Sequence, residues 1–150
     1  MNNLIQTIKL NSKIAGISSE EVSLAKTLVE NKCKDRKLFV CEGLWAVDKL
    51  IEKNIKVTHF LYNGDKLDAG KIDEKSLEKI AKMSKYSANS YAISEKACKK
   101  ISDRDGYDEY FIVAFDYITQ KIVGVYCYNG CAIAGERYYS LKDLRENISK

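Results

Sequence analysis

The amino-acid sequence predicts an α/β fold in which about four mostly parallel strands are covered by helices on both faces. Two observations carry this prediction. Short apolar runs, rich in β-branched and aromatic residues, read as strands, and they alternate with longer segments whose apolar residues recur at helical spacing. Strands that are separated by helices are usually parallel and buried on both sides. We therefore expect a three-layer α/β/α sandwich.

Within residues 18–116, four segments have the pattern of helices. Ser18 and Glu21 have the spacing of a capping box, which predicts that the first helix opens there. A turn signal at Asn63-Gly64-Asp65 and a polar loop over 65–73 precede the third helix. The other three predicted helices are Leu44 to about Asn54, Glu74–Tyr86 and Ser94–Ile101.

The predicted strands are Leu38–Cys41, Lys56–Tyr62, Ala88–Ile93 and Tyr110–Phe115. The first dozen residues are weakly patterned. We therefore divide the chain into an N-terminal extension (1–17), a main domain (18–116) and a C-terminal part (117–150). In the last part, Gln120–Tyr128 is rich in β-formers and Ser140–Ile148 has the pattern of a helix.

The composition is that of one globular domain. Of the 150 residues, 45% are hydrophobic and 31% are charged. No apolar run approaches the roughly 18 residues that span a bilayer, and the start lacks the layout of a signal peptide, so we expect a cytoplasmic protein without a membrane partner. Five cysteines, an odd number, argue against a disulfide framework. The net charge of +4 permits binding to a phosphate backbone but does not demand it.

A basic segment joins the first predicted helix to the first predicted strand. Lys32, Lys34, Arg36 and Lys37 place four cations within six residues, which would attract the phosphates of a nucleic acid. Arg36 is the first choice, because its planar guanidinium can contact a phosphate with two hydrogen bonds. The alternative is a solvated helix end whose cations complement the helix dipole.

Two further groups are candidates for nucleic-acid contacts. Glu42-Gly43 closes a strand before a helix, where free amides could face an anion, although this could equally be only a good helix start. A second basic patch comprises Lys96, Lys99, Lys100 and Arg104, with Arg104 in a loop at the mouth of a strand. We expect the single tryptophan, Trp45, to be a core residue of the helix.

Residues for metal or acid–base chemistry are sparse. His59 is the only histidine and lies within a predicted strand. Cys127 and Cys131 lack further ligands at zinc spacing, so we expect no metal. The sequence holds neither a P-loop nor a dinucleotide-binding glycine motif. We expect no catalytic residue.

Several stretches, in this order and spacing, resemble the substrate-binding domain of the SpoU/TrmH-type RNA 2′-O-ribose methyltransferases. The segment from Arg36 to Gly43 fits that family's R-x-x-F-x-x-E-G motif. The similar stretches are Lys34–Leu44, Ile55–Tyr62, Tyr91–Glu95, Lys99–Asp103 and Phe111–Ala114. The resemblance covers about residues 18–116. It departs from the family at Gly106-Tyr107-Asp108-Glu109, where the family often has Pro-Gln-Gly.

The resemblance implies the RNA-binding sandwich fold shared with some ribosomal proteins, and structured rRNA or tRNA as the partner. The family's cofactor is S-adenosylmethionine, which a second, knotted domain binds. Residues 121–136 faintly echo the start of that domain, but Ala134-Gly135-Glu136 replaces the family's Pro-Gly-Asn and no later motif follows. We therefore expect a chain that recognises RNA without holding the cofactor. The alternatives are a protein-interaction or dimerisation module, including a homodimer, and a remnant that has lost RNA binding.

Overall fold

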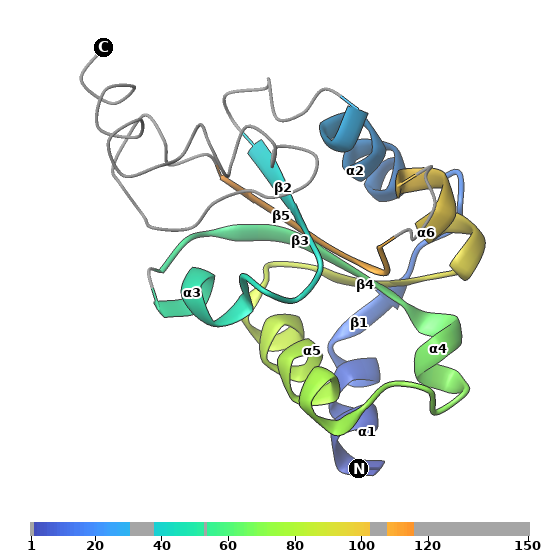
Figure 1. Cartoon of the computed structure of the whole chain (residues 1–150), viewed down its shortest axis with the longest axis vertical. Coiled ribbons are helices and arrows are strands. Elements are labelled where there is room, and N and C mark those ends of the chain that lie inside the picture. Colours follow the sequence, from blue (N-terminus) through green and yellow to red (C-terminus); the bar gives the residue numbers. More distant parts are fainter. Residues whose placement is uncertain (1, 31–37, 53, 103–107, 116–150) are drawn as a thin grey trace.

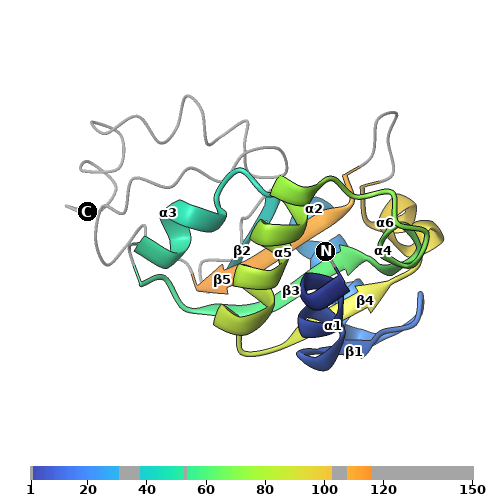
Figure 2. The same ribbon diagram turned by 90° about the horizontal axis from the view of Figure 1, so that it is seen from below.

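The computed structural model describes residues 2–30, 38–52, 54–102 and 108–115. They form one five-stranded sheet with helices on both faces (Figures 1 and 2). The elements in chain order are α1 (Asn2–Leu10), β1 (Ser12–Ile14), α2 (Glu20–Glu30), β2 (Leu38–Glu42), α3 (Val47–Glu52), β3 (Val57–Asn63), α4 (Gly64–Asp68), α5 (Glu74–Tyr86), β4 (Ser90–Ile93), α6 (Glu95–Ser102) and β5 (Tyr110–Phe115). The predicted α/β class is confirmed.

The sheet has the strand order β1-β4-β3-β5-β2. β1, β4 and β3 pair in parallel, whereas β5 is antiparallel to both β3 and β2. Four strands therefore share one direction, and their carboxyl ends lie at one edge of the sheet. β5 runs the other way because the chain enters it at this same edge, where Tyr110 pairs with Tyr62 near the end of β3. We call the edge of the sheet at which these four strands end the carboxyl edge.

Two apolar layers fill the sandwich, one on each face of the sheet. Along β3, Phe60 and Tyr62 point into the layer under α1, α3 and α5, and Leu61 between them points into the layer under α2 and α6. β5 alternates in the same way, with Ile112 in the first layer and Val113 in the second. Strands buried on both faces explain why the sequence shows near-continuous apolar runs here instead of alternation.

The N-terminal residues contribute to this sheet. Ser12 pairs with Ser90 and Ile14 with Ala92, which makes β1 an edge strand, and Ile8 of α1 is fully buried against the same core. The weak pattern of the first dozen residues hid both elements. The division of the chain at residues 17 and 116 stays a prediction, and the elements expected over 120–128 and 140–148 lie outside the described residues.

The predicted helix starts need three corrections. Ser19, and not Ser18, caps α2, because its Oγ accepts a hydrogen bond from Val22 N. α3 begins at Val47 instead of Leu44, because the chain first makes a turn after β2. Where the sequence predicted a turn and a polar loop after β3, the chain forms the short helix α4. The side chain of Asn63 accepts a hydrogen bond from Lys66 N and caps this helix.

The other helix and strand predictions hold within about two residues, as element boundaries usually allow. α5 spans Glu74–Tyr86 as predicted, with Asp73 as its cap. Ser94 caps α6 by accepting a hydrogen bond from Ala97 N. Asn54 ends the turn after α3 with a φ of 55°, the left-handed conformation that asparagine tolerates better than most residues.

Candidate nucleic-acid interface

A polar cluster lies at the carboxyl edge, where β3 ends and β5 begins. Glu109, just before β5, accepts hydrogen bonds from two donors: Asn63 Nδ2 at 2.8 Å and Lys66 Nζ at 2.7 Å. Asn63 is fully buried, and the Asn63 backbone N also donates to Glu109 O at 3.0 Å. One carboxylate therefore satisfies a buried amide and neutralises a lysine, which fixes α4 against the start of β5.

The end of β2 belongs to the same edge. Glu42 is only 1% exposed, and its Oε1 lies 3.3 Å from Ser102 Oγ at the end of α6. Ser102 Oγ also accepts a hydrogen bond from Asp108 N. Glu42 thus acts inside the protein, where it holds Ser102, which in turn binds Asp108 on the other side of segment 103–107. Its predicted role as an RNA contact remains untested, and this burial favours a positioning role.

Gly43 adopts a φ of 102°, a conformation that residues with a side chain rarely reach. Its N donates to Tyr110 O at 2.8 Å, so this amide is not available to an anion as the sequence pattern suggested. A Cβ at Gly43 would lie 3.3 Å from Trp45 Cδ1. The glycine therefore lets the indole of Trp45 lie close to the chain.

Trp45 is not the core residue that its spacing suggested. Its side chain is 45% exposed, and its Nε1 donates to Glu42 O at 3.0 Å. The sequence signal that could have found this is Gly43: a glycine with positive φ delays the start of α3, so that Trp45 falls in the preceding turn and not on the helix face.

α6 carries the described part of the second basic patch. It runs along the carboxyl edge, from Glu95 N, which donates to Asp65 Oδ2, to Ser102 beside Glu42 (Figure 1). Lys99 is exposed. Lys100 is partly engaged in the protein, because its Nζ donates to Ile17 O at 2.9 Å.

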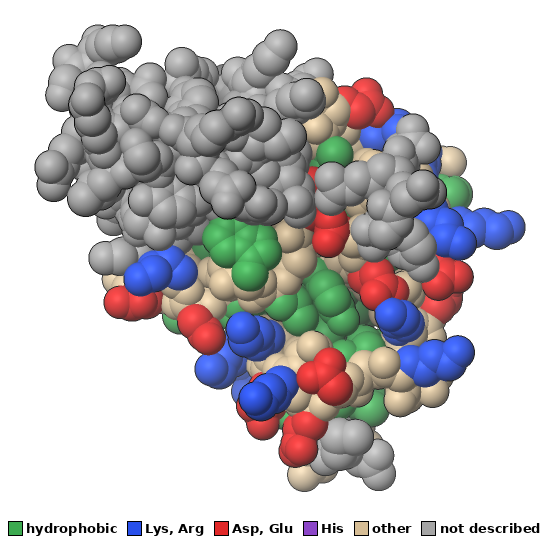
Figure 3. Space-filling model, viewed as in Figure 1, with side chains coloured by type: hydrophobic (Ala, Val, Ile, Leu, Met, Phe, Trp, Pro, Cys, Tyr) green, Lys and Arg blue, Asp and Glu red, His purple; other side chains and the backbone are tan. Residues whose placement is uncertain are grey.

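The charges of the described residues balance. These residues hold as many lysines as acidic residues, so the whole net charge of +4 comes from residues outside the described ranges. On the face seen in Figure 3, basic and acidic side chains are interspersed around α4 and α6. Segment 31–37 supplies most of the excess, with four cations against the single acid Asp35.

The predicted contacts Lys32, Lys34, Arg36, Lys37 and Arg104 lie outside the described residues. The flanking residues still locate where their segments join the sheet. Leu38, after segment 31–37, pairs with Phe115 at the end of β5, at the edge opposite Glu42. With about 3.3 Å per strand residue, roughly 13 Å separates the two ends of β2. Segment 31–37 therefore joins the sheet at the other edge from Glu42, Gly43, Lys99 and Lys100.

The described residues contain no group of three or more His, Cys, Asp or Glu side chains that could hold a metal ion. Among the same residues, no helix is long and apolar enough to cross a membrane. Within the described part of the chain, Cys41 and Cys98 are buried free thiols. His59 is half-buried, and its ring stacks on Tyr91 of β4 with the ring centroids 6.0 Å apart.

No family model and no curated protein matches the chain. Solved structures do. An rRNA methyltransferase from Sinorhizobium meliloti superimposes with a TM-score of 0.51 and 18% identity, over 69% of this chain and 37% of that one. An RNA 2′-O ribose methyltransferase superimposes with a TM-score of 0.50 and 20% identity, over 68% and 36%. The chain thus shares its fold with a part of these enzymes that makes up little more than a third of their length.

Proposed function

We propose that this chain is an RNA-recognition domain of the kind that presents substrate RNA to a 2′-O-ribose methyltransferase, and that it binds structured rRNA or tRNA. The observation that carries the proposal is the fold shared with part of two RNA methyltransferases. The resemblance of residues 18–116 to the SpoU/TrmH family supports the same assignment independently of the fold. Because rRNA and tRNA are the proposed ligands, we also place the protein in the cytoplasm.

The proposed RNA contacts belong to segments near the two ends of β2. Segment 31–37 contributes Lys32, Lys34, Arg36 and Lys37, whose charge would attract phosphates. The second group of contacts consists of Lys99, Lys100 and Arg104. At the carboxyl edge, Glu42 and Gly43 support the turn that follows β2. The two ends of β2, from which the chain leads to these two groups, lie roughly 13 Å apart. We expect an RNA that binds both groups to be recognised by its shape and phosphates.

A salt series with the full chain tests this proposal. We expect binding to a pool of ribosomal RNA to weaken steeply as the salt concentration rises, because released counterions drive the association. In the double variant Arg36→Ala/Lys37→Ala, two phosphate contacts are lost, and the slope of log K against log salt should flatten by roughly 1 to 2. Filter binding or fluorescence anisotropy measures both.

The matched control is Lys82→Ala/Lys85→Ala, which removes two exposed lysines from α5 on the other side of the sheet from α6. It should bind RNA with the wild-type salt slope. Wild-type protein that fails to bind RNA at low salt would overturn the proposed function. Equal losses in the two double variants would show that only net charge matters and that segment 31–37 is not the contact.

The proposal includes the absence of methyl transfer by this chain alone. Its support is Ala134-Gly135-Glu136, where the family has the Pro-Gly-Asn of its first cofactor-binding motif. We expect no heat of binding when S-adenosylmethionine is titrated into the protein in a calorimeter. Binding of the cofactor, or transfer of its methyl group to RNA, would contradict this part of the proposal and leave RNA recognition standing.

A second candidate function is a protein-interaction or dimerisation module. Two exposed apolar side chains at the edge of the sheet favour it: Leu10 is 86% exposed and Ile14, on the edge strand β1, is 91% exposed. Light scattering at several protein concentrations tests it. A dimer that the Leu10→Ser variant dissociates, together with no RNA binding by the wild type, would favour this function over the first.

A further inference from the structure

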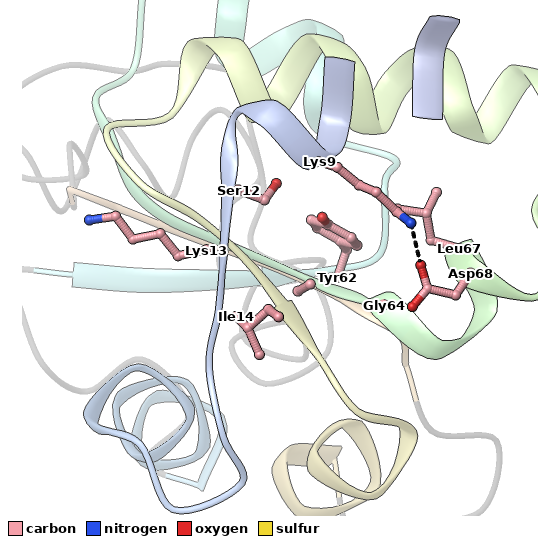
Figure 4. A pocket seen from close by; sticks show the side chains of 9 residues that line it. Lys9, Ser12, Lys13, Ile14, Tyr62, Gly64, Leu67 and Asp68 are labelled. Carbon is pink, nitrogen blue, oxygen red and sulfur yellow. Dashed lines mark ion pairs between the residues drawn. The ribbon is translucent and has the colours of Figure 1, made fainter. Parts of the chain in front are cut away.

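A pocket of about 250 Å³ lies between the N-terminal segment and α4, and neither Lys99 nor Lys100 lines it (Figure 4). The end of α1 and β1 form one wall, and α4 forms the other. This volume is about eight times the 30 Å³ that one water molecule occupies in the liquid, and it is below the 300–1,000 Å³ of drug-sized pockets. The pocket therefore has room for a single flat ring system.

The depth of the pocket depends on two small residues. A Cβ at Gly64 would lie only 3.0 Å from Ala92 Cβ, so a larger residue at either position would fill the space between β4 and α4. Leu67 and Ile14 add apolar surface at the sides. A slot with apolar walls and a floor of small residues suits the faces of an aromatic ring.

The polar groups at the rim come as a donor beside an acceptor. Lys9 Nζ lies 2.8 Å from Asp68 Oδ1, and both side chains line the pocket (Figure 4). The two side chains are 56% and 64% exposed, so a ligand can reach both, and an ion pair this exposed contributes little stability that a ligand would have to replace. Lys13 projects away from this pair (Figure 4) and is not one of the proposed ligand contacts.

We propose that this pocket binds the guanine base of an unpaired nucleotide. Guanine offers the O6 acceptor next to the N1–H and N2–H donors along one edge. The Lys9 ammonium can donate to O6 while the carboxylate oxygens of Asp68 accept from N1–H and N2–H. The ring then lies in the slot between Ile14 and Leu67. The choice of a nucleotide as the ligand rests on the proposed function.

The free nucleotide and a guanine within RNA share this chemistry, and separate titrations distinguish them. The probes are guanosine 5′-monophosphate, adenosine 5′-monophosphate, and two short single-stranded RNAs: oligouridine with one central guanine, and oligouridine alone. Each is titrated into the full, ¹⁵N-labelled chain, and the backbone amide signals of Gly64, Leu67 and Ala92 are followed by NMR. We expect guanosine monophosphate to shift these signals at a lower concentration than adenosine monophosphate does. In the same way, the RNA with a central guanine should act at a lower concentration than oligouridine alone.

Asp68→Asn removes the carboxylate that accepts both donors, and the loss should weaken guanosine monophosphate binding by roughly tenfold or more, as for hydrogen bonds to a charged group. Ile14→Ser tests the apolar wall and should weaken binding of both nucleotides. The matched control is Asp48→Asn, since Asp48 forms a similarly exposed pair with Lys82 on other elements. It should bind like the wild type.

The outcomes separate the two proposals. Unchanged guanosine binding in Asp68→Asn, or equal binding of guanosine and adenosine monophosphates, overturns the guanine site. Structured RNA that binds with a steep salt dependence, while neither guanine-bearing probe binds, overturns only the guanine site. Guanosine monophosphate that binds to a protein without affinity for any RNA supports the site with the free nucleotide as its ligand, and overturns the proposed function.

Discussion

Lys66 Nζ lies 2.7 Å from Glu109 Oε1, and this ion pair joins α4, after β3, to the residue that precedes β5. The second oxygen of Glu109 accepts a hydrogen bond from Nδ2 of Asn63, which is fully buried. The pair is better shielded than the others of the described residues, because the Glu109 side chain is only 18% exposed. Its carboxylate is therefore a structural link of the carboxyl edge.

We predict that Glu109→Ala lowers the free energy of unfolding by about 1–3 kcal/mol, because the buried amide of Asn63 and the ammonium of Lys66 lose their shared acceptor. Urea unfolding followed by circular dichroism measures this change. Asp48→Ala is the control: it breaks a pair whose side chains are 61% and 63% exposed, and the change should stay below about 1 kcal/mol. Equal effects of the two substitutions would show that burial does not strengthen the Glu109 link.

Gly43→Ala should also destabilise the protein. The φ of 102° is strained for alanine, and its Cβ would lie 3.3 Å from Trp45 Cδ1, so we expect a loss of about 1–3 kcal/mol. Because Trp45 is the single tryptophan, its fluorescence emission should change with the same substitution. Gly16→Ala is the control, since a Cβ there meets nothing within 4 Å, and it should be within about 0.5 kcal/mol of the wild type. An unchanged emission spectrum in Gly43→Ala would contradict the contact.

The sequence predicted β2, β3, β4 and β5 well, because these strands are largely buried on both faces and read as apolar runs. It did not predict the direction of β5. Direction depends on whether the preceding helix carries the chain back across the sheet, and α6 instead runs along one edge. β1 was missed for a related reason: an edge strand of three residues with Lys13 and Ile14 exposed has almost no apolar pattern.

The candidate site was predictable in residue type more than in role. The sequence singled out Glu42 and Gly43 at the end of a strand, and their role as RNA contacts stays a prediction. The burial of Glu42 beside Ser102 and the positive φ of Gly43 depend on the tertiary structure, which the sequence pattern does not reveal. The pocket beside α4 was beyond sequence reasoning altogether. It brings Lys9 and Asp68 together across 59 positions of the chain, through the pairing of β1 with β4.

His59 makes stability depend on pH. Its ring stacks on Tyr91 at 6.0 Å, and burial lowers the pKa of His59 below 6.5, although the charge of Glu21 opposes this shift. The unfolded chain therefore binds a proton more readily than the folded one. The part of the stability that depends on neutral His59 is fully present above pH 6.5. It is lost as the pH falls from 6.5 toward the lowered pKa.

We therefore expect the free energy of unfolding of the wild type to fall between pH 7.5 and 5.5, and to fall less in His59→Gln. Urea titrations at the two pH values test this. Since His59 is the only histidine, no other imidazole contributes in this window. A wild type and a variant with the same pH dependence would refute the lowered pKa.

Cys98 should resist alkylation in the folded protein. It lies on α6 and is fully buried in the layer that α6 shares with α2. Burial, with the nearby carboxylates of Glu109, Asp65 and Glu95, raises the pKa of its thiol to about 12. Only the thiolate reacts with iodoacetamide, so at pH 8 the peptide that contains Cys98 should stay unmodified in the native protein and become fully modified in guanidinium chloride. Mass spectrometry of the digested protein measures both. Rapid labelling without denaturant would show that α6 opens readily from the sheet, and would remove the rigid edge on which the proposed Lys99 and Lys100 contacts depend.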